Sequence, residues 1–157
     1  MVDGELLNKI YLKLIKNNYK IATAESCTGG LVGHSLTNIS GISDYFERGI
    51  ISYSNKSKIE LLDVPKELII NHGAVSREVA LAMAEGIRKK YGLDIGLSTT
   101  GIAGPTGGTK DKPVGLVFIG LSLKDESYVE KHIFKGNRIE NKESTCEAAL
   151  NMLNKYI

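Results

Sequence analysis

Tryptophan is absent from this 157-residue sequence, and cysteine and proline are scarce, with two and three residues respectively. The two cysteines, Cys27 and Cys146, lie far apart, which excludes a disulfide-rich scaffold and predicts reduced thiols in a cytoplasm. No segment approaches the roughly 20 apolar residues of a membrane span. Residues 1–20 carry acidic side chains and no continuous apolar run, so neither a signal peptide nor a membrane partner is expected.

A large excess of charge of either sign is also missing. The 20 Lys and Arg residues are nearly balanced by 18 Asp and Glu residues, and the net charge is +2. Because nucleic-acid binders usually carry a clustered basic face, no nucleic-acid partner is predicted. His34, His72 and His132 have no His or Cys neighbour at the spacing of a metal site, and no metal is expected.

What the sequence does contain is an alternation of helical and strand patterns. Hydrophobic residues make up 42% of the chain, and no repeat or linker interrupts it, which predicts a single domain over residues 1–157. Helices are expected over residues 3–16, from Cys27 onward, and over 55–62, 76–91 and 140–155. Strands are expected over residues 20–24, 48–53, 95–99, 114–123 and 128–135.

The order of these elements predicts the fold class. Helices and strands alternate up to residue 99, which favours crossover connections and parallel pairing. Only K-D-E-S separates the last two strands, so this pair is expected to be an antiparallel hairpin. The prediction is an α/β protein, a three-layer α/β/α sandwich with a mixed, partly parallel sheet.

Two glycine-containing segments follow predicted strands. They are E-S-C-T-G-G (25–30) and T-T-G-I-A-G-P-T-G-G-T-K-D-K-P-V-G (99–115). Parallel strands bring their carboxyl ends to one edge of a sheet, where ligands usually bind. Thr109 stands where a P-loop would need lysine, and Ala24 and Thr28 replace the glycines of a G-x-S-x-G elbow, so neither motif is present.

Ser26 is the candidate nucleophile. A hydroxyl at the turn from strand to helix would lie beside the backbone N–H groups of Cys27 and Thr28, which could stabilise an oxyanion with help from the helix dipole. The alternative is that Ser26 only caps the helix. The Cys27 thiol is a second candidate nucleophile, although a buried cysteine is usually inert.

A lysine is the candidate base, because no histidine is placed to serve Ser26. In the predicted helix 55–62, Lys56 and Lys58 are about 200° apart, so only one can face inward. Lys58 shares its face with Leu61 and Leu62. We therefore expect Lys58 to be partly buried, which would lower its pKa toward a useful range.

Taken together, these segments resemble the C-terminal domain of the CinA family (competence/damage-inducible protein A), in the form that stands alone as a nicotinamide-nucleotide amidohydrolase. The matching motifs are A-E-S-C-T-G-G (24–30), F-E-R-G (46–49), Y-S-N-x-x-K (53–58), H-G-A-V-S (72–76), T-G-I-A-G-P (100–105), G-G (107–108), K-P-V-G (112–115) and G-N-R (136–138). The resemblance covers nearly the whole chain.

The resemblance implies deamidation of nicotinamide mononucleotide to nicotinate mononucleotide and ammonia, without a cofactor or metal. It assigns the nucleophile to Ser26 and the base to Lys58, and adds Thr100 and Arg138 to the active site. It also implies substrate contacts at Glu25, Cys27, Thr28, Gly29, Tyr53, Gly101, Ile102, Ala103 and Gly104. The resemblance also suggests a homodimer. The alternative is a module that binds a pyridine nucleotide without turnover.

Two departures from the family pattern lie near Arg138. Asn137 stands where the family usually has aspartate, and Lys142 and Glu143 occupy a region that often carries further arginines. Arg138 could bind the substrate phosphate or orient catalytic groups, and these departures bear on the first role.

Overall fold

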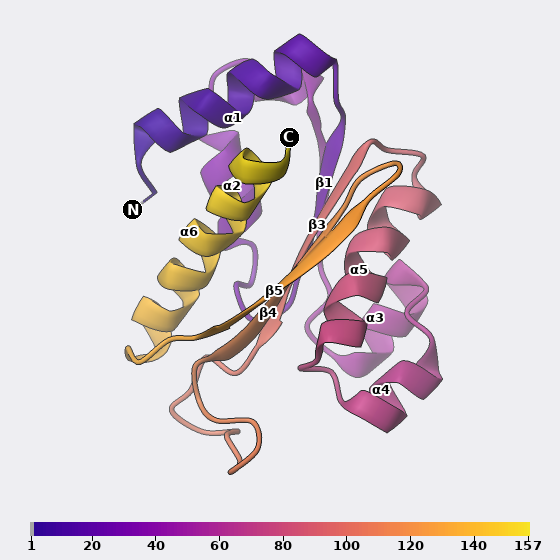
Figure 1. The fold of residues 1–157 in the computed structure, drawn as a ribbon, viewed down its shortest axis with the longest axis vertical. Coiled ribbons are helices and arrows are strands. Elements are labelled where there is room, and N and C mark those ends of the chain that lie inside the picture. The colour runs from indigo at the N-terminus through magenta and orange to yellow at the C-terminus, as the bar shows by residue number, and fades with distance from the viewer. Residues whose placement is uncertain (1) are drawn as a thin grey trace.

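A five-stranded mixed sheet forms the centre of the computed structural model, which describes residues 2–157 (Figure 1). The strands are β1 (Ile21–Glu25), β2 (Phe46–Ile51), β3 (Ile95–Gly101), β4 (Leu116–Ser122) and β5 (Ser127–Ile133). Their order is β2-β1-β3-β4-β5; β1 is parallel to β2 and β3, whereas β4 is antiparallel to β3 and β5. The predicted mixed sheet is confirmed.

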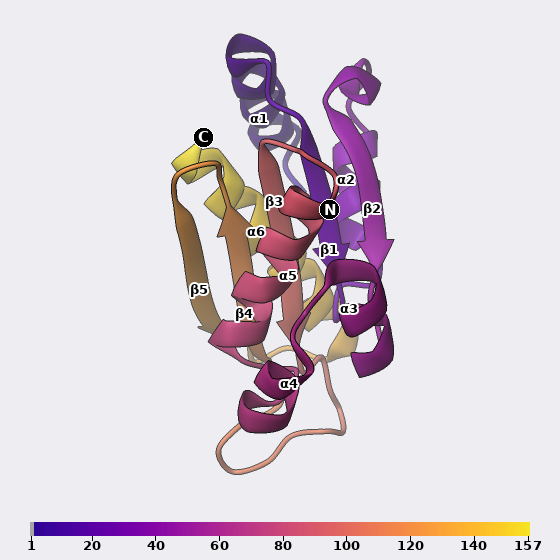
Figure 2. The same ribbon diagram turned by 90° about the vertical axis from the view of Figure 1, so that its right-hand side faces the viewer.

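Helices cover both faces of this sheet (Figures 1 and 2). One face carries α1 (Gly4–Asn17), α2 (Leu31–Thr37) and α6 (Arg138–Tyr156). The other carries α3 (Asn55–Leu62), α4 (Lys66–His72) and α5 (Arg77–Lys90), and a short 3-10 helix, η1 (Ile42–Asp44), precedes β2. Each face has its own hydrophobic core, so the predicted three-layer α/β/α arrangement is confirmed.

The alternation of side chains along β1 aims the following residue at the α3/α5 face. Ile21 packs in the core on the α6 side, whereas Ala22 and Ala24 pack in the core on the α5 side. Successive side chains of a strand point to opposite faces, so Ser26, two residues beyond Ala24, points toward α3 and α5.

The boundaries of several elements differ from the sequence predictions. The second strand begins and ends two residues earlier than predicted, and Ser54 caps α3 in a reciprocal capping box with Ser57. The helix α4 was not predicted; it is only seven residues long. The long helix α5 is as expected: Ser76 caps it, and its apolar stripe is buried.

A close helix crossing fixes α3 against α5. A Cβ atom at Gly86 would lie 1.8 Å from the carbonyl oxygen of Leu62, a distance that real Cβ atoms do not reach. Glycine at this position therefore lets the end of α3 approach the α5 backbone directly. This contact sets the position of the helix that carries Lys58.

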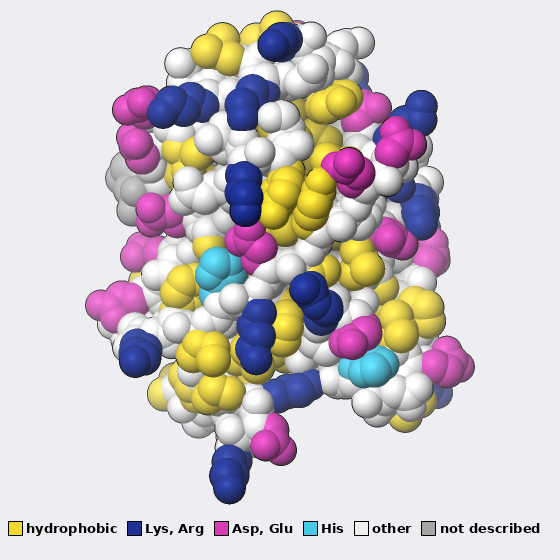
Figure 3. All heavy atoms as spheres, viewed as in Figure 1, with side chains coloured by type: hydrophobic (Ala, Val, Ile, Leu, Met, Phe, Trp, Pro, Cys, Tyr) yellow, Lys and Arg dark blue, Asp and Glu magenta, His cyan; other side chains and the backbone are white. Residues whose placement is uncertain are grey.

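Acidic and basic side chains are interspersed on the face of the molecule shown in Figure 3. Within residues 2–157, no helix is both long enough and apolar enough to cross a membrane.

Candidate active site

Ser26 lies in a turn at the carboxyl end of β1. Its backbone N–H donates to the carbonyl of Thr99 (2.9 Å), which extends the β1–β3 pairing by one residue. The predicted helix start at Cys27 is wrong: residues 27–30 form a turn, and α2 begins at Leu31. The reason is local, since Gly29 and Gly30 adopt positive φ angles of 61° and 101°, which interrupt a right-handed helix.

Glu25 holds this turn in place from inside the protein. Its side chain is 2% exposed, and its carboxylate accepts hydrogen bonds from the backbone N–H groups of Gly30 (3.0 Å), Val32 (3.1 Å) and Gly33 (2.8 Å). The carboxylate thus caps the first turn of α2. By contrast, within residues 2–157 the N–H groups of Cys27 and Thr28 form no hydrogen bond to another residue.

A chain of hydroxyl groups leads from Thr99 to the same carboxylate, beneath the buried thiol of Cys27. Thr28 Oγ1 donates to Glu25 (2.6 Å) and lies 2.7 Å from Thr99 Oγ1, so Thr99 must donate to Thr28. Burial raises the pKa of Cys27 to about 12, so the thiol stays protonated near neutral pH.

Lys58 contacts Ser26 directly. Its side chain is only 1% exposed, and its Nζ lies 3.0 Å from Ser26 Oγ. The expected difference between the two lysines of α3 is confirmed, since the Lys56 side chain is 80% exposed and pairs with Glu60. Burial is the main cause that lowers the pKa of Lys58 from 10.5 to about 8.

Two backbone carbonyls orient the Lys58 amine. Nζ donates to the carbonyls of Ser52 (2.8 Å) and Tyr53 (3.3 Å). A neutral amine has two N–H groups and one lone pair, so these two contacts leave the lone pair for Ser26 Oγ–H. The pair is therefore arranged for proton transfer from the serine hydroxyl to the lysine amine.

Thr100 lies next to Ser26 on the neighbouring strand. The β1–β3 register pairs Glu25 with Thr99, so the next residues of the two strands lie side by side on the same face. Thr100 is 1% exposed, and its Oγ1 donates to the carbonyl of Ala74 (2.8 Å), just before α5.

The start of α6 fastens the loop that follows β3. Arg138 donates to the carbonyl of Gly104 (2.7 Å) and to the hydroxyl of Tyr53 (3.1 Å). Asn141, 1% exposed, donates to the carbonyl of Ala103 (3.0 Å). Asn137 caps α6 in a capping box with Glu140, so the asparagine found in place of aspartate still caps the helix that carries Arg138.

These side chains meet around a cavity of about 280 Å³. Its lining includes all four predicted catalytic residues and six of the predicted substrate contacts. The four are Ser26, Lys58, Thr100 and Arg138, and the six are Cys27, Tyr53, Gly101, Ile102, Ala103 and Gly104. Glu25, Thr28 and Gly29 do not line the cavity, and the structure places them in and beneath the turn.

The sequence interpretation did not assign a site role to five further residues of the lining: Asn55, Ala74, Val75, Thr106 and Gly107. Ala74 contributes its backbone carbonyl, which carries no residue-type signal. The H-G-A-V-S motif was available as a pointer to this segment, but nothing in the sequence alone connected it with Thr100.

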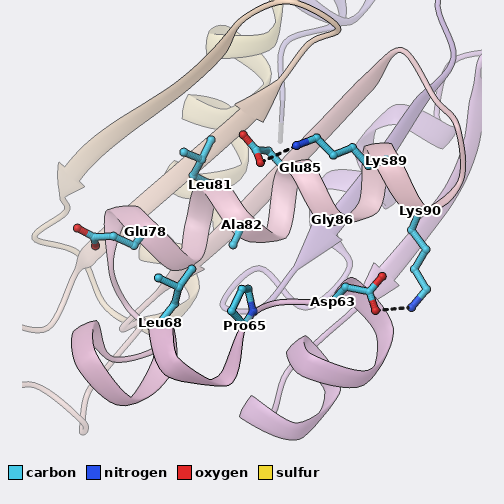
Figure 4. A pocket seen from close by; sticks show the side chains of 10 residues that line it. All are labelled: Asp63, Pro65, Leu68, Glu78, Leu81, Ala82, Glu85, Gly86, Lys89 and Lys90. Carbon is cyan, nitrogen blue, oxygen red and sulfur yellow. Dashed lines mark hydrogen bonds and ion pairs between the residues drawn. The ribbon is translucent and has the colours of Figure 1, made fainter.

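A second, larger hollow of about 510 Å³ lies between α4 and α5 (Figure 4). Leu68, Leu81 and Ala82 contribute apolar surface, and four charged residues at its edge form two ion pairs, Glu85 with Lys89 and Asp63 with Lys90. It contains no nucleophile beside a base, so the smaller cavity at Ser26 is the candidate active site.

Sequence comparison gives matches over nearly the whole chain. The family model described as the CinA C-terminal domain matches residues 3–157. A Clostridium tetani protein that bears the name competence-damage inducible protein is 53% identical over 156 residues, 99% of this chain. A protein of the same name from Caldicellulosiruptor bescii is 48% identical over 157 residues. This chain spans 38% of the length of each relative.

Solved structures share the fold. The competence/damage inducible protein CihA from Agrobacterium tumefaciens superposes with a TM-score of 0.93 at 36% identity, covering 98% of this chain and 96% of that one. The competence or damage-inducible protein from Enterobacter asburiae gives a TM-score of 0.94 at 28% identity, covering 99% and 98%.

Proposed function

Because this chain belongs to the CinA C-terminal domain family, we propose that it hydrolyses the carboxamide of nicotinamide mononucleotide, giving nicotinate mononucleotide and ammonia. The observation that carries the proposal is the contact between two buried side chains, Ser26 Oγ and Lys58 Nζ, at 3.0 Å. A module that only binds a nucleotide does not require a nucleophile beside a base of lowered pKa.

In the first half of the reaction, neutral Lys58 takes the proton of Ser26 while Oγ bonds to the carboxamide carbon. The carbonyl oxygen becomes an oxyanion, and the backbone N–H group of Cys27, which lines the cavity beside Ser26 and bonds no other residue within 2–157, is the donor available in the turn. The C–N bond then breaks, its electron pair stays on nitrogen, and the Lys58 ammonium supplies the proton with which ammonia leaves.

In the second half, Lys58 takes a proton from water as the water oxygen attacks the acyl carbon. The bond to Ser26 Oγ breaks, and the proton returns to the serine. The nicotinate carboxylate is released, and the enzyme regains its starting protonation state. The acid formed in this step gives its proton to the released ammonia, so one amide and one water give one carboxylate and one ammonium ion.

The size and charge of the cavity support a nucleotide with a small aromatic amide. Its volume of about 280 Å³ lies just below the roughly 300–1,000 Å³ of sites for drug-sized ligands, so it suits the pyridine ring, with the ribose phosphate toward the rim. Arg138 stands at that rim and is solvent-exposed. Only two of its five N–H donors are hydrogen-bonded within residues 2–157, so we assign the 5′-phosphate to Arg138.

The test is ammonia release from nicotinamide mononucleotide by the purified protein. The matched control is Ser26→Ala, which should release no ammonia above background yet bind the nucleotide within a few-fold of wild type, because the hydroxyl acts in bond making. Nucleotide binding without turnover by the wild-type protein would contradict the proposal and indicate a binding module instead.

A further inference from the structure

The proton of the Thr100 hydroxyl has a fixed destination. Thr100 Oγ1 donates to the carbonyl of Ala74 at 2.8 Å, and the direction is certain because a carbonyl has no proton to give. A hydroxyl has a single proton, so Oγ1 offers only lone pairs to any other partner. Thr100 lines the cavity, and toward a bound ligand it is therefore a hydrogen-bond acceptor.

The groups around Ser26 thus differ in whether they donate or accept hydrogen bonds. The turn offers the backbone N–H donor of Cys27, which lines the cavity and bonds no other residue within 2–157, and the adjacent strand offers the acceptor Thr100 Oγ1. A carboxamide has one acceptor, its oxygen, and one donor, its NH₂ group. A carboxylate has two acceptor oxygens and no donor, so it matches only the turn.

We propose that Thr100 is the residue by which this site distinguishes a carboxamide from a carboxylate. This inference rests on the proposed amide hydrolysis. Thr100 Oγ1 accepts an N–H bond from the amide nitrogen, which aligns the group that will leave as ammonia. After hydrolysis a carboxylate oxygen occupies that position and faces the lone pairs of Oγ1, which favours release of the product.

The Ala74 carbonyl keeps the Thr100 hydroxyl from turning its proton toward a bound carboxylate. Thr100 could turn its proton to the carboxylate, but Ala74 would then lose the one hydrogen bond that its carbonyl accepts within residues 2–157. Leaving such a group unsatisfied weakens binding on the order of ten- to a hundredfold. We expect the amide to bind more tightly than the acid by a factor of this size.

The experiment measures binding of nicotinamide mononucleotide and nicotinate mononucleotide to the full chain by titration calorimetry, in the inactive Ser26→Ala background. Working at pH 9, above the pKa of Lys58, keeps its ammonium from attracting the carboxylate. Adding Thr100→Val should reduce the amide preference to within about threefold, chiefly by weakening the amide, because valine has no acceptor. Thr100→Ser should retain the preference.

Thr37→Val is the matched control, because the Thr37 hydroxyl also donates to a carbonyl, that of His34 (2.9 Å), but lies on α2 outside the cavity. It should leave the preference unchanged. Equal weakening of both ligands by Thr100→Val would overturn the assignment and indicate a structural role.

A measurement on the wild-type enzyme tests the same point without the valine variant. The acid should inhibit amide hydrolysis with an inhibition constant at least tenfold above the amide dissociation constant. An inhibition constant equal to that dissociation constant would overturn the role of Thr100 while leaving the amidohydrolase intact. Absence of ammonia release from the wild type would instead refute the proposed function, and this inference with it.

Discussion

Replacing Lys58 by arginine should nearly abolish ammonia release while keeping a positive charge at the site. The reasoning depends on the amine being neutral in an appreciable fraction of molecules. Burial lowers its pKa to about 8, so roughly a tenth of the enzyme carries the neutral amine at pH 7. At the ordinary value of 10.5 the neutral fraction would be about 0.03%, some three-hundredfold less.

The pH dependence of the wild-type enzyme follows from the same numbers. The basic form is active, so the rate should rise about tenfold between pH 7 and pH 9 and then level off. A guanidinium has a pKa above 12 and stays protonated throughout this range, so Lys58→Arg should lose the general base, an effect of typically 10²–10⁴ in rate. The Cys27 thiol, with a pKa of about 12, does not titrate in this window.

The assay is ammonia release at nucleotide concentrations well below KM, where the rate reports kcat/KM and so the free enzyme, measured from pH 6 to pH 10 for three proteins. They are the wild type, Lys58→Arg, and Lys56→Ala as the control on the exposed side of α3. The control should reproduce the wild-type profile. An active arginine variant with that profile, or a wild-type rate that does not change between pH 7 and pH 9, would refute Lys58 as the base.

Four further predictions concern the residues around this pair. Cys27→Ser should keep most of the activity in the ammonia assay, because the turn contributes a backbone N–H group and the thiol stays protonated; an inactive variant would move the nucleophile to the thiol. Glu25→Gln should lower the free energy of unfolding in urea by about 1–3 kcal/mol and reduce kcat, since an amide cannot accept all the N–H groups that the carboxylate accepts. Arg138→Ala should raise KM for the nucleotide far more than for the phosphate-free riboside, and an equal rise for both would contradict the phosphate contact. Finally, the pKa of Lys58 is lower in the folded than in the unfolded protein, so the stability that neutral Lys58 contributes is lost as pH falls through about 8. In denaturant titrations, the free energy of unfolding of the wild type should rise by up to about 3 kcal/mol relative to that of Lys58→Met between pH 7 and pH 10.5. A constant difference between the two proteins would contradict the lowered pKa.

The sequence was sufficient to predict the layers of the fold and which side of α3 is buried at Lys58 and which is exposed at Lys56. Helical spacing is a periodic signal, and it separated the buried Lys58 from the exposed Lys56. Leu61, expected on the buried face with Lys58, is 41% exposed, whereas the neighbouring Leu62 is fully buried.

The turn after β1 could not be predicted from the same signals. Its geometry depends on a buried carboxylate that binds three backbone N–H groups and on two glycines with positive φ angles, none of which has a periodic pattern. The bond from Thr100 to Ala74 was equally hidden, since it joins residues 26 apart through a backbone carbonyl. The contacts between Lys58 and the carbonyls of Ser52 and Tyr53 could not be predicted either, because they also involve backbone carbonyls.

The way this site is distributed along the chain has a consequence for refolding. Ser26 and Lys58 lie 32 residues apart, and Arg138 reaches Tyr53 across 85 residues. Contacts between residues this far apart in sequence form late, because the entropy of closing a long loop is lost before the contact contributes any stability. No local fragment contains a working part of the site, so recovery of catalysis after dilution from denaturant reports completion of the sheet and the docking of α6, while helix formation seen by circular dichroism can precede it.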